Sequence, residues 1–548
     1  MKRAHLPIET LPAWVKLNGI GVESVVFGTL GADHHENDTS GSSSSSSSSN
    51  SNKGTGIIAT EDRAGGESAL GAVDTGVLLK VPPDLILSLE TVHGYAKSDG
   101  RLRAVLEAVG EFARTPRGAI LIFLLMQITH SSPDCTGQSQ AVGVAGPWTE
   151  YMKYMPREIP LPTFYSEAEL ELLRGTSLRL AVHAKLAALE KEFARLREAT
   201  RGIDWCREVW WGGEDADPDG DDLEGDGDDD VAGEEAARLT LEDWKYVDAL
   251  YRSRMVDLPT SGHAMVPCID MANHSSEETV KALYDEDAEG NVVLQLRYGK
   301  RVRAGEEVTI SYGDEKPASE MIFSYGFLDR ETADAKQVFL DLDIPDDDPL
   351  KVVKKAFCKE PPGVRVYTSA TDSESAPTTA WESSIIWWAC VNEEDGLDFT
   401  VLQTNDGGRE LKALWKGAEL RDSAHLSELL RADPHWDIIQ LRAVVLILER
   451  LETQAWVLRE TGLMVSEIDE NEDMRAMFRP DVYDMIKRLR ALEMNLLGRG
   501  IEGLAMRRDE LMASPAVSQY LGQQQPETAG AEDVSSQQQS EDVEDDFS

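Results

Sequence analysis

The chain contains 548 residues, of which 41% are hydrophobic, and it carries a formal net charge of −45 at pH 7. A chain of this length exceeds one ordinary hydrophobic core, so we expect two or three packed units. The acidic excess repels nucleic-acid phosphate and attracts basic surfaces, so we expect a basic protein partner and no direct nucleic-acid partner. The same charge can equally serve only to keep the chain in solution.

Cysteine usage and hydropathy indicate the compartment. The five cysteines lie far apart and form no CxxC pair, which predicts neither a disulfide framework nor a zinc site. The longest apolar run, residues 119–128, is much shorter than the ~20 residues that span a bilayer. Residues 1–10 lack the apolar centre of a signal peptide, and the ten histidines contain no H-E-x-x-H pattern. We therefore expect a soluble protein of the cytoplasm, the nucleus or both, without membrane or metal.

Three segments have the composition of disordered chain. Residues 33–52 include an uninterrupted run of eight serines, residues 208–237 hold fourteen acidic residues and no basic one, and residues 521–548 are rich in Gln, Glu, Asp and Ser. None can bury enough apolar surface to offset the entropy of ordering. Within the acidic segment, residues 215–226 resemble a calcium loop, but Pro at its fourth position and Asp at its twelfth favour a charged linker.

The first half of the chain changes from a strand pattern to a helical one. Residues 11–32 and 53–93 predict short β-segments separated by turns, the clearest at 76–83. From about 101 to 206 the apolar period becomes helical. One predicted buried face carries Leu178, Val182, Leu186, Leu189, Phe193 and Leu196.

The second half begins with a helix and returns to strands. Residues 241–256 predict a helix, and residues 264–312 predict strands, the last of them at 308–312. Residues 331–520 are expected to be mainly helical, with the strongest amphipathic pattern at 441–458.

The first chemical motif is the triplet Asn273-His274-Ser275, which directly follows an apolar, strand-like run. Polar groups at the end of such a run can face a ligand at the edge of a core. Taken alone, the triplet is more often a turn whose side chains satisfy its own backbone.

The second motif is a pair of tyrosines that are each followed by glycine, Tyr312-Gly313 and Tyr325-Gly326. Tyr312 is the last residue of the predicted strand segment 308–312, and Tyr325 ends a short predicted helix. Glycine lets the backbone approach a ligand closely. Two such pairs could also be aromatic plugs with polar tips at the surface.

Together the two motifs resemble the SET-domain family, in particular the branch of the Rubisco large-subunit methyltransferases and the ribosomal-protein lysine methyltransferases. The resemblance implies an α+β chain: a β-rich SET fold with an inserted helical subdomain and a mainly helical C-terminal domain. It implies these boundaries: the N-terminal SET part at 11–95 with the serine-rich insert 33–52, a helical insertion at 96–254 with the acidic segment 208–237, the C-terminal SET part at 255–330, a substrate-binding domain at 331–520, and a tail at 521–548.

The resemblance also implies a role for each matching position. S-adenosylmethionine would be the cofactor, and Tyr312 would be the catalytic residue. The residues expected to bind the cofactor are Gly54, Gly56, Arg254, Asn273, His274 and Tyr312. The residues expected to bind the substrate are Ser253, Tyr284 and Tyr325. Arg254 could equally be an ordinary surface cation.

The expected reaction sets a clear physical demand on such a site. A lysine ammonium with a pKa near 10.4 cannot attack a methyl group, and lowering that pKa by about three units costs on the order of 4 to 5 kcal/mol. A narrow aromatic channel supplies part of this by desolvation, and a sulfonium adds like-charge repulsion.

The substrate and the acceptor atom stay open at this point. Family resemblance implies a ribosomal protein or a translation factor. A histone stays an alternative, although the chain lacks the cysteine-rich flanks often found in histone-directed enzymes. One alternative is histidine methylation by the same fold. Another is a catalytically inactive SET scaffold, or an acidic chaperone for basic proteins that works through residues 208–237.

Overall fold

The computed structural model describes residues 1–30, 54–67, 73–74, 76–135, 143–212, 239–313, 315–359, 361–369, 378–403 and 408–523. The serine-rich run, most of the acidic segment with its calcium-like loop, and nearly all of the tail lie outside these residues. The chain forms two compact units. Unit 1 contains residues 1–338 and 455–496, and unit 2 contains residues 339–454 and 497–548.

The β-part of unit 1 is a set of small antiparallel sheets. The largest has the strand order β1-β7-β11-β10, built from β1 (Gly21–Val22), β7 (Val77–Val81), β11 (Val292–Leu296) and β10 (Ala282–Glu286). The smaller pairs are β2 (Val25–Thr29) with β3 (Thr55–Ala59), β4 (Arg63–Ala64) with β12 (Arg301–Val302), β5 (Gly66–Glu67) with β6 (Val73–Asp74), and β8 (Met255–Leu258) with β9 (Gly262–Met265). Strands from either side of the helical region therefore share one sheet.

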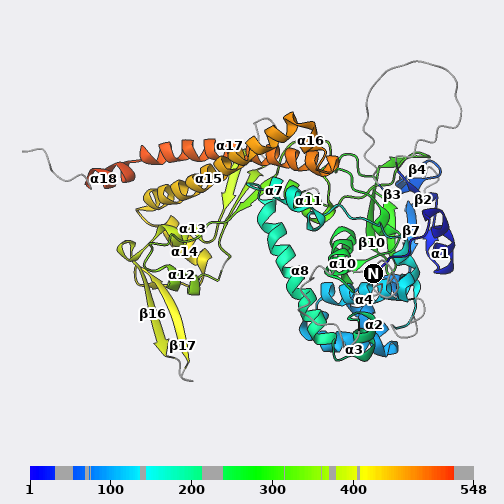
Figure 1. The fold of residues 1–548 in the computed structure, drawn as a ribbon. Helices are drawn as coiled ribbons and strands as arrows, with labels where there is room; N and C mark the ends of the chain where they lie inside the picture. Colours follow the sequence, from blue (N-terminus) through cyan, green and yellow to red (C-terminus); the bar gives the residue numbers. More distant parts are fainter. Residues whose placement is uncertain are drawn as a thin grey trace, which may run out of the picture. The chain divides into compact units, whose positions relative to one another are not determined.

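The helical part of unit 1 lies between β7 and β8 in the chain. It contains α2 (Leu89–Ser98), α3 (Gly100–Val109), α4 (Pro116–Ser131), α6 (Pro147–Tyr151), α7 (Glu167–Leu172), α8 (Leu178–Thr200), α9 (Asp204–Val209) and α10 (Leu241–Arg254). Figure 1 shows β2, β3 and β7 gathered at one end of the unit and α2, α3 and α4 at the other. A short helix, α11 (Ala318–Tyr325), follows the last strand of the unit.

Helix α4 is the centre of this helical part. Every residue from Gly118 to Thr129 is buried, so the apolar run of the sequence is a core helix. Thr115 caps its first turn by accepting from the Gly118 N–H, and Pro116 occupies the position where a missing N–H costs nothing. Among the described residues no helix is long and apolar enough to cross a membrane.

Unit 2 combines two three-stranded sheets with parts of two long helices. The sheets are β13 (Gln337–Leu340), β14 (Val364–Ser369) and β15 (Thr378–Glu382), and β16 (Leu397–Gln403), β17 (Arg409–Trp415) and β18 (Ala418–Glu419). The helices of this region are α12 (Lys351–Phe357), α13 (Ile386–Cys390), α14 (Ser423–Arg431), α15 (Trp436–Glu470), α16 (Glu472–Arg475), α17 (Pro480–Met512) and α18 (Pro515–Gln523). α15 and α17 contribute residues to both units.

Three expectations about secondary structure need correction. Residues 11–17 form a helix, α1 (Leu11–Leu17), instead of a strand, because Leu11, Trp14 and Val15 bury one helical face. The predicted β-region 53–93 ends in the helix α2, whose first turn has a capping box between Ser88 and Thr91. The described residues of 337–419 contain six strands within the region predicted as mainly helical, although α15 and α17 bear out the helical pattern in its second half.

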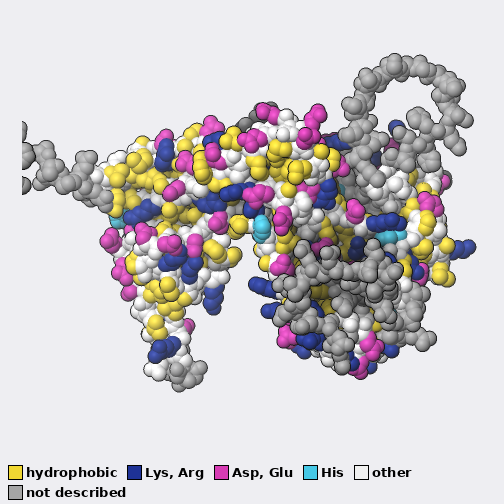
Figure 2. Space-filling view, in the orientation of Figure 1, with side chains coloured by type: hydrophobic (Ala, Val, Ile, Leu, Met, Phe, Trp, Pro, Cys, Tyr) yellow, Lys and Arg dark blue, Asp and Glu magenta, His cyan; other side chains and the backbone are white. Residues whose placement is uncertain are grey.

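The α+β class with long C-terminal helices is confirmed. In Figure 2 acidic and basic side chains are interleaved over the visible face. On that face the described acidic residues therefore gather in no single patch.

Candidate active site

One short segment, residues 307–312, assembles the site. The Val308 N–H donates to the Ile57 carbonyl of β3 at 2.8 Å. Two residues later the Ile310 N–H donates to the Asn273 carbonyl at 3.0 Å, and the Ser275 N–H donates back to the Ile310 carbonyl at 3.0 Å. The segment therefore lies between β3 and the Asn273-His274-Ser275 triplet. It makes only isolated bridges to them, so the regular strand predicted at 308–312 is wrong.

His274 joins the triplet to the tyrosine motif. Its Nδ1 accepts from the Tyr312 N–H at 3.0 Å, which places the ring proton on Nε2. Nε2 lies 3.0 Å from an oxygen of Asp329, and the His274 side chain is only 6% exposed. The imidazole is also stacked on the Tyr312 ring, with 5.3 Å between the ring centroids. Both ring nitrogens are therefore occupied, and the orientation of the ring is fixed.

Asn273 faces β3. Its Nδ2 donates to Glu307 at 2.8 Å and to the Thr55 carbonyl at 3.4 Å. A Cβ on Gly56 would lie 3.1 Å from that Nδ2 and 2.5 Å from a methyl carbon of Leu30. Gly56 therefore leaves the space in which the Asn273 amide lies.

Glycine is favoured at position 54 for a different reason. It has a φ of +74°, and an added Cβ would meet nothing within 4 Å. Its carbonyl accepts from the Leu30 N–H at 2.9 Å, directly before β3 begins. Here the backbone conformation favours glycine, whereas at Gly56 the packing does.

Tyr312 lies in a group of aromatic rings. Its ring centroid is 4.5 Å from that of Tyr325 and 6.3 Å from that of Phe327. Its hydroxyl donates to the Ala272 carbonyl at 2.9 Å. Burial raises the pKa of Tyr312 well above its ordinary value, although the nearby Arg254 lowers it. Burial likewise raises the pKa of Tyr325 to about 12. Both phenols therefore keep their protons at neutral pH.

Arg254 is tied to a buried carboxylate beside this aromatic group. Its Nη1 donates to the Asp270 carbonyl at 3.0 Å and lies 3.2 Å from an oxygen of the Asp270 carboxylate. That carboxylate also accepts from the Tyr151 hydroxyl, which in turn accepts from the Cys268 N–H at 2.7 Å. Arg254 is therefore an inward-facing residue with a fixed partner, and the alternative that it is an ordinary surface cation is wrong.

Cys268, whose N–H belongs to this network, has an uncommon backbone conformation. It has a φ of +73°, which L-residues other than glycine rarely adopt. Its side chain is fully buried next to Asp270. Such a strained residue is found mainly where the surrounding contacts enforce a particular geometry.

The two other residues expected to bind the substrate, Tyr284 and Ser253, differ in their contacts. Tyr284 of β10 pairs with Leu294 and faces the backbone of Asp257, and its phenol is close enough to Tyr325 to raise the pKa of the Tyr325 phenol. The Ser253 hydroxyl instead donates to the Ala249 carbonyl of its own helix at 2.8 Å. Tyr284 therefore lies within electrostatic reach of the aromatic group, whereas the hydroxyl of Ser253 is engaged within α10.

Among the residues at the site that were not predicted from the sequence are Asp270, Tyr151 and Asp329. Asp270 stands three positions before Asn273, inside the motif already noted, so its carboxylate in an apolar run was a usable signal. Tyr151 and Asp329 carry no local pattern that distinguishes them. Phe327 lies in the Tyr325-Gly326-Phe327 sequence and adds the third ring of the group.

The sequence was compared with protein families and with known proteins. No family model matches the sequence. "SET domain-containing protein 8" of Schizosaccharomyces pombe is 26% identical over 375 residues, which are 68% of this chain and 75% of that protein. The chloroplastic "[Fructose-bisphosphate aldolase]-lysine N-methyltransferase" of Arabidopsis thaliana is 24% identical over 208 residues, 37% of each chain. The Rubisco large subunit N-methyltransferase of Nicotiana tabacum is 23% identical over 210 residues, again 37% of each.

Solved structures agree in fold. The SET domain of the Rubisco large-subunit methyltransferase bound to lysine and AdoHcy superposes with a TM-score of 0.58, at 16% identity and 92% coverage of both chains. The same type of enzyme bound to AdoMet gives a TM-score of 0.56, at 16% identity, with 92% of this chain and 93% of that chain covered. The chain therefore has the SET fold. Its similarity in sequence and fold to protein-lysine methyltransferases, including the Rubisco large-subunit enzymes, confirms the resemblance predicted from the sequence.

Proposed function

We propose that this chain transfers a methyl group from S-adenosylmethionine to the side-chain amine of a lysine in a basic, non-histone protein such as a ribosomal protein or a translation factor. The observation that carries the proposal is the packing of Tyr312 against Tyr325, beside the His274 ring that binds the Tyr312 backbone. Relatives with sequence similarity are named as lysine N-methyltransferases, and the solved relatives hold AdoMet or AdoHcy.

The residues around β3 fit the cofactor. Gly56 has no side chain, which leaves room beside β3 for the Asn273 amide. Asn273, with its amide, and the backbone around His274 would hold S-adenosylmethionine, together with Gly54, Arg254 and Tyr312. When bound, this group supplies a methyl carbon made electrophilic by a positive sulfur.

The aromatic residues would receive the lysine side chain. Tyr284, Tyr312 and Tyr325 present rings and hydroxyls that exclude water from an aliphatic chain and orient its terminal nitrogen. Desolvation among these rings disfavours the ammonium form of the lysine. Because the pKa of Tyr312 is raised, its hydroxyl acts as a neutral dipole and not as a phenolate base. The lysine proton would therefore leave through water.

The charge of the chain supports a basic substrate. The formal net charge of −45 attracts lysine-rich and arginine-rich surfaces and accelerates their encounter with the chain. This attraction is screened by salt, so methylation of a basic protein is expected to slow as the ionic strength rises.

The test is labelling with an isotopically marked methyl donor. The full chain is incubated with cell-extract proteins and the labelled cofactor, and mass spectrometry then identifies the labelled residues. Labelled methyl-lysine in a basic non-histone protein is expected, and its loss with Tyr312→Phe ties it to this site. Labelled methyl-histidine would overturn lysine as the acceptor and show that histidine is methylated instead. No label in any protein would overturn the proposal.

The acidic-chaperone alternative predicts a different result. A chaperone would bind a basic client, with lysozyme as the probe, without cofactor and would lose that binding when residues 208–237 are deleted. The proposed enzyme instead binds S-adenosylmethionine in calorimetry and loses that binding when Asn273 is replaced. The deletion of residues 208–237 and the replacement of Asn273 change different parts of the chain. The two variants therefore distinguish the two functions.

A further inference from the structure

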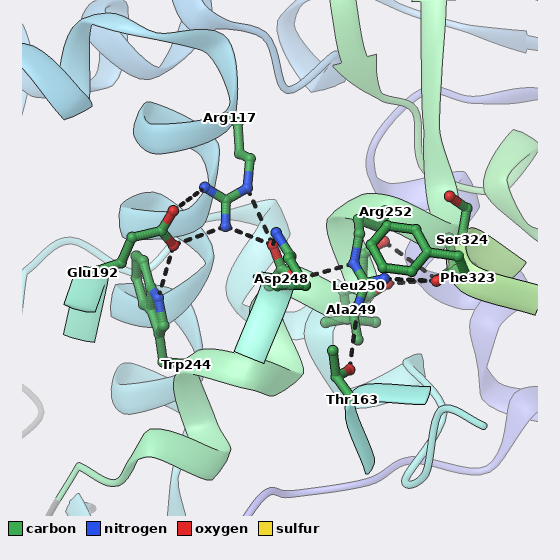
Figure 3. Close-up of polar contacts among 12 residues, drawn as sticks. Arg117, Thr163, Glu192, Trp244, Asp248, Ala249, Leu250, Arg252, Phe323 and Ser324 are labelled. Atoms are coloured by element: carbon green, nitrogen blue, oxygen red, sulfur yellow. Dashed lines mark hydrogen bonds and ion pairs between the residues drawn. The ribbon is translucent and has the colours of Figure 1, made fainter. Parts of the chain in front are cut away.

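A buried ionic cluster joins helices α4, α8 and α10. Asp248 of α10 is fully buried and contacts three cations: Arg117 of α4 at 2.6 Å, Lys185 of α8 at 2.7 Å and Arg252 of α10 at 2.9 Å. Glu192 of α8 binds Arg117 through two hydrogen bonds of 2.7 and 2.9 Å. Figure 3 shows Asp248 between Arg117 on one side and Arg252 on the other.

The cluster holds the helices of the insertion together. Burial alone would raise the pKa of Asp248, but the three cations outweigh it and hold that pKa below its ordinary value. Removing one charged partner from such a buried cluster leaves the remaining charges without full compensation. Each cation is therefore expected to stabilise the fold. A stabilising role is therefore shared by Arg117, Lys185 and Arg252.

Arg252 alone among the three reaches α11. Its Nη1 donates to the Phe323 carbonyl at 2.6 Å, and its guanidinium carbon lies 4.7 Å from the centroid of the Phe323 ring. Its Nη2 donates to the Thr163 hydroxyl at 3.1 Å. In Figure 3 the Phe323 ring lies beside the Arg252 guanidinium. One side chain thus binds Asp248, Thr163 and the last turn of α11 at once.

The hydrogen bond from Arg252 fills an open acceptor in the last turn of α11. The final carbonyls of a helix have no partner within it, and Arg252 supplies one to Phe323. Just beyond, Gly326 has a φ of +79°, and a Cβ there would lie 2.6 Å from the Pro160 carbonyl oxygen. The chain is therefore fixed on both sides of Tyr325, by Arg252 before it and by the close packing of Gly326 after it.

We infer that Arg252 is a positioning residue for the reaction: it fixes the last turn of α11 and so sets where the Tyr325 ring lies relative to Tyr312. This inference rests on the proposed function. The phenol of Tyr325 would line the space for the substrate nitrogen, so its position limits both the rate and the number of methyl groups that fit. A lysine at position 252 would keep the charge beside Asp248 but would lose the planar fork that reaches Phe323 and Thr163.

The test compares Arg252→Met and Arg252→Lys with the matched control Arg117→Met. Both methionine variants remove one cation from Asp248, but only Arg252 contacts α11. With cell-extract proteins and labelled cofactor, Arg252→Met is expected to lower the initial rate about 10-fold and to change the ratio of mono- to di- and trimethyl-lysine. Arg252→Lys should recover part of the rate. Arg117→Met should lower thermal stability while keeping the product ratio of the unchanged chain.

A second readout needs no turnover. With 3-fluorotyrosine incorporated only at position 325, the ¹⁹F signal of the full chain should shift or broaden in Arg252→Met and stay in place in Arg117→Met. An unchanged signal in Arg252→Met, or an equal change in both variants, would overturn the positioning role. Absence of labelled protein with the unchanged chain would overturn the proposed function instead, and the fluorine signal would still decide the role of Arg252.

Discussion

The imidazole of His274 accepts a hydrogen bond from the backbone N–H of Tyr312 across 3.0 Å, and the two rings stack at 5.3 Å. This contact joins two motifs that are 38 positions apart in the chain. Because Nε2 of the same ring faces Asp329, the ring cannot turn without losing a partner on each side. The position of Tyr312 therefore depends on His274.

Replacing His274 by alanine removes the acceptor of the Tyr312 N–H and the aromatic neighbour of its ring. We expect methylation of cell-extract proteins to fall by about 10- to 100-fold, because misplacement of a reacting group by about 1 Å costs that much. Asp329→Asn is the matched control, since an amide oxygen can still accept from Nε2. It should keep the rate within a few-fold of the unchanged chain. Equal losses in both variants would assign the effect to the charge of Asp329.

Replacing Tyr312 by phenylalanine removes one hydroxyl and keeps the ring that packs against Tyr325 and Phe327. We expect turnover to fall by about 100-fold or more, because the hydroxyl that donates to the Ala272 carbonyl, and that in the proposed function orients the lysine nitrogen, is lost. Affinity for S-adenosylmethionine in calorimetry should stay nearly unchanged. Tyr298→Phe is the control, because Tyr298 is 85% exposed. Normal turnover by Tyr312→Phe would end the assignment of Tyr312 as the catalytic residue.

Replacing Gly56 by alanine puts a methyl group 3.1 Å from the Asn273 amide and 2.5 Å from Leu30. The amide must move, so we expect weaker binding of S-adenosylmethionine, by about 10-fold. Gly28→Ala serves as the control: Gly28 pairs with Gly56 in the β2–β3 ladder, but its added methyl would meet only the tip of Ile58, at 3.1 Å. If Gly28→Ala weakens binding equally, distortion of the ladder and not Asn273 is responsible.

The sequence predicted the motifs of the site better than their connections. Asn273, His274, Tyr312 and Tyr325 were identifiable because each stands at the end of an apolar segment or beside a glycine. That residues 307–312 lie between β3 and the triplet was not predictable, because local periodicity carries no information on which distant segment a backbone will bond. The same limit applies to Arg252, whose importance lies in a contact with Phe323, 71 positions away.

The strands of residues 337–419 were missed for a different reason. Val364-Arg-Val-Tyr-Thr-Ser369 and Arg409-Glu-Leu-Lys-Ala-Leu-Trp415 do alternate, but the long helical pattern of residues 441–458 dominated the region. Residues 11–17 were predicted as strand but form a helix, with Pro12 in its first turn, where proline is favourable. Short elements are therefore decided by packing more than by local pattern.

Glu493 of α17 makes the stability of unit 1 depend on pH. Its carboxylate is 1% exposed, and it accepts from the N–H of Ser177 at 2.9 Å and from the Ser177 hydroxyl. Burial raises its pKa to about 7, although the bonds from Ser177 and the charge of Arg490 oppose the rise. The folded chain then keeps this proton to about pH 7, whereas the unfolded chain releases it near its ordinary value of 4.5. Glu493 is therefore expected to make stability fall as the pH rises from about 4.5 to about 7, by at most ~3 kcal/mol.

Glu493→Gln removes this titration and keeps an acceptor for the Ser177 N–H. The variant should melt at the same temperature as the unchanged chain at pH 5, where the carboxyl is protonated in the folded state. At pH 8 the variant should melt higher, because only the unchanged chain then carries a buried charge. Thermal melting of both proteins at the two pH values measures the difference. The same gap between the two melting temperatures at pH 5 and pH 8 would contradict the raised pKa, since a difference independent of pH would come from packing at position 493 alone.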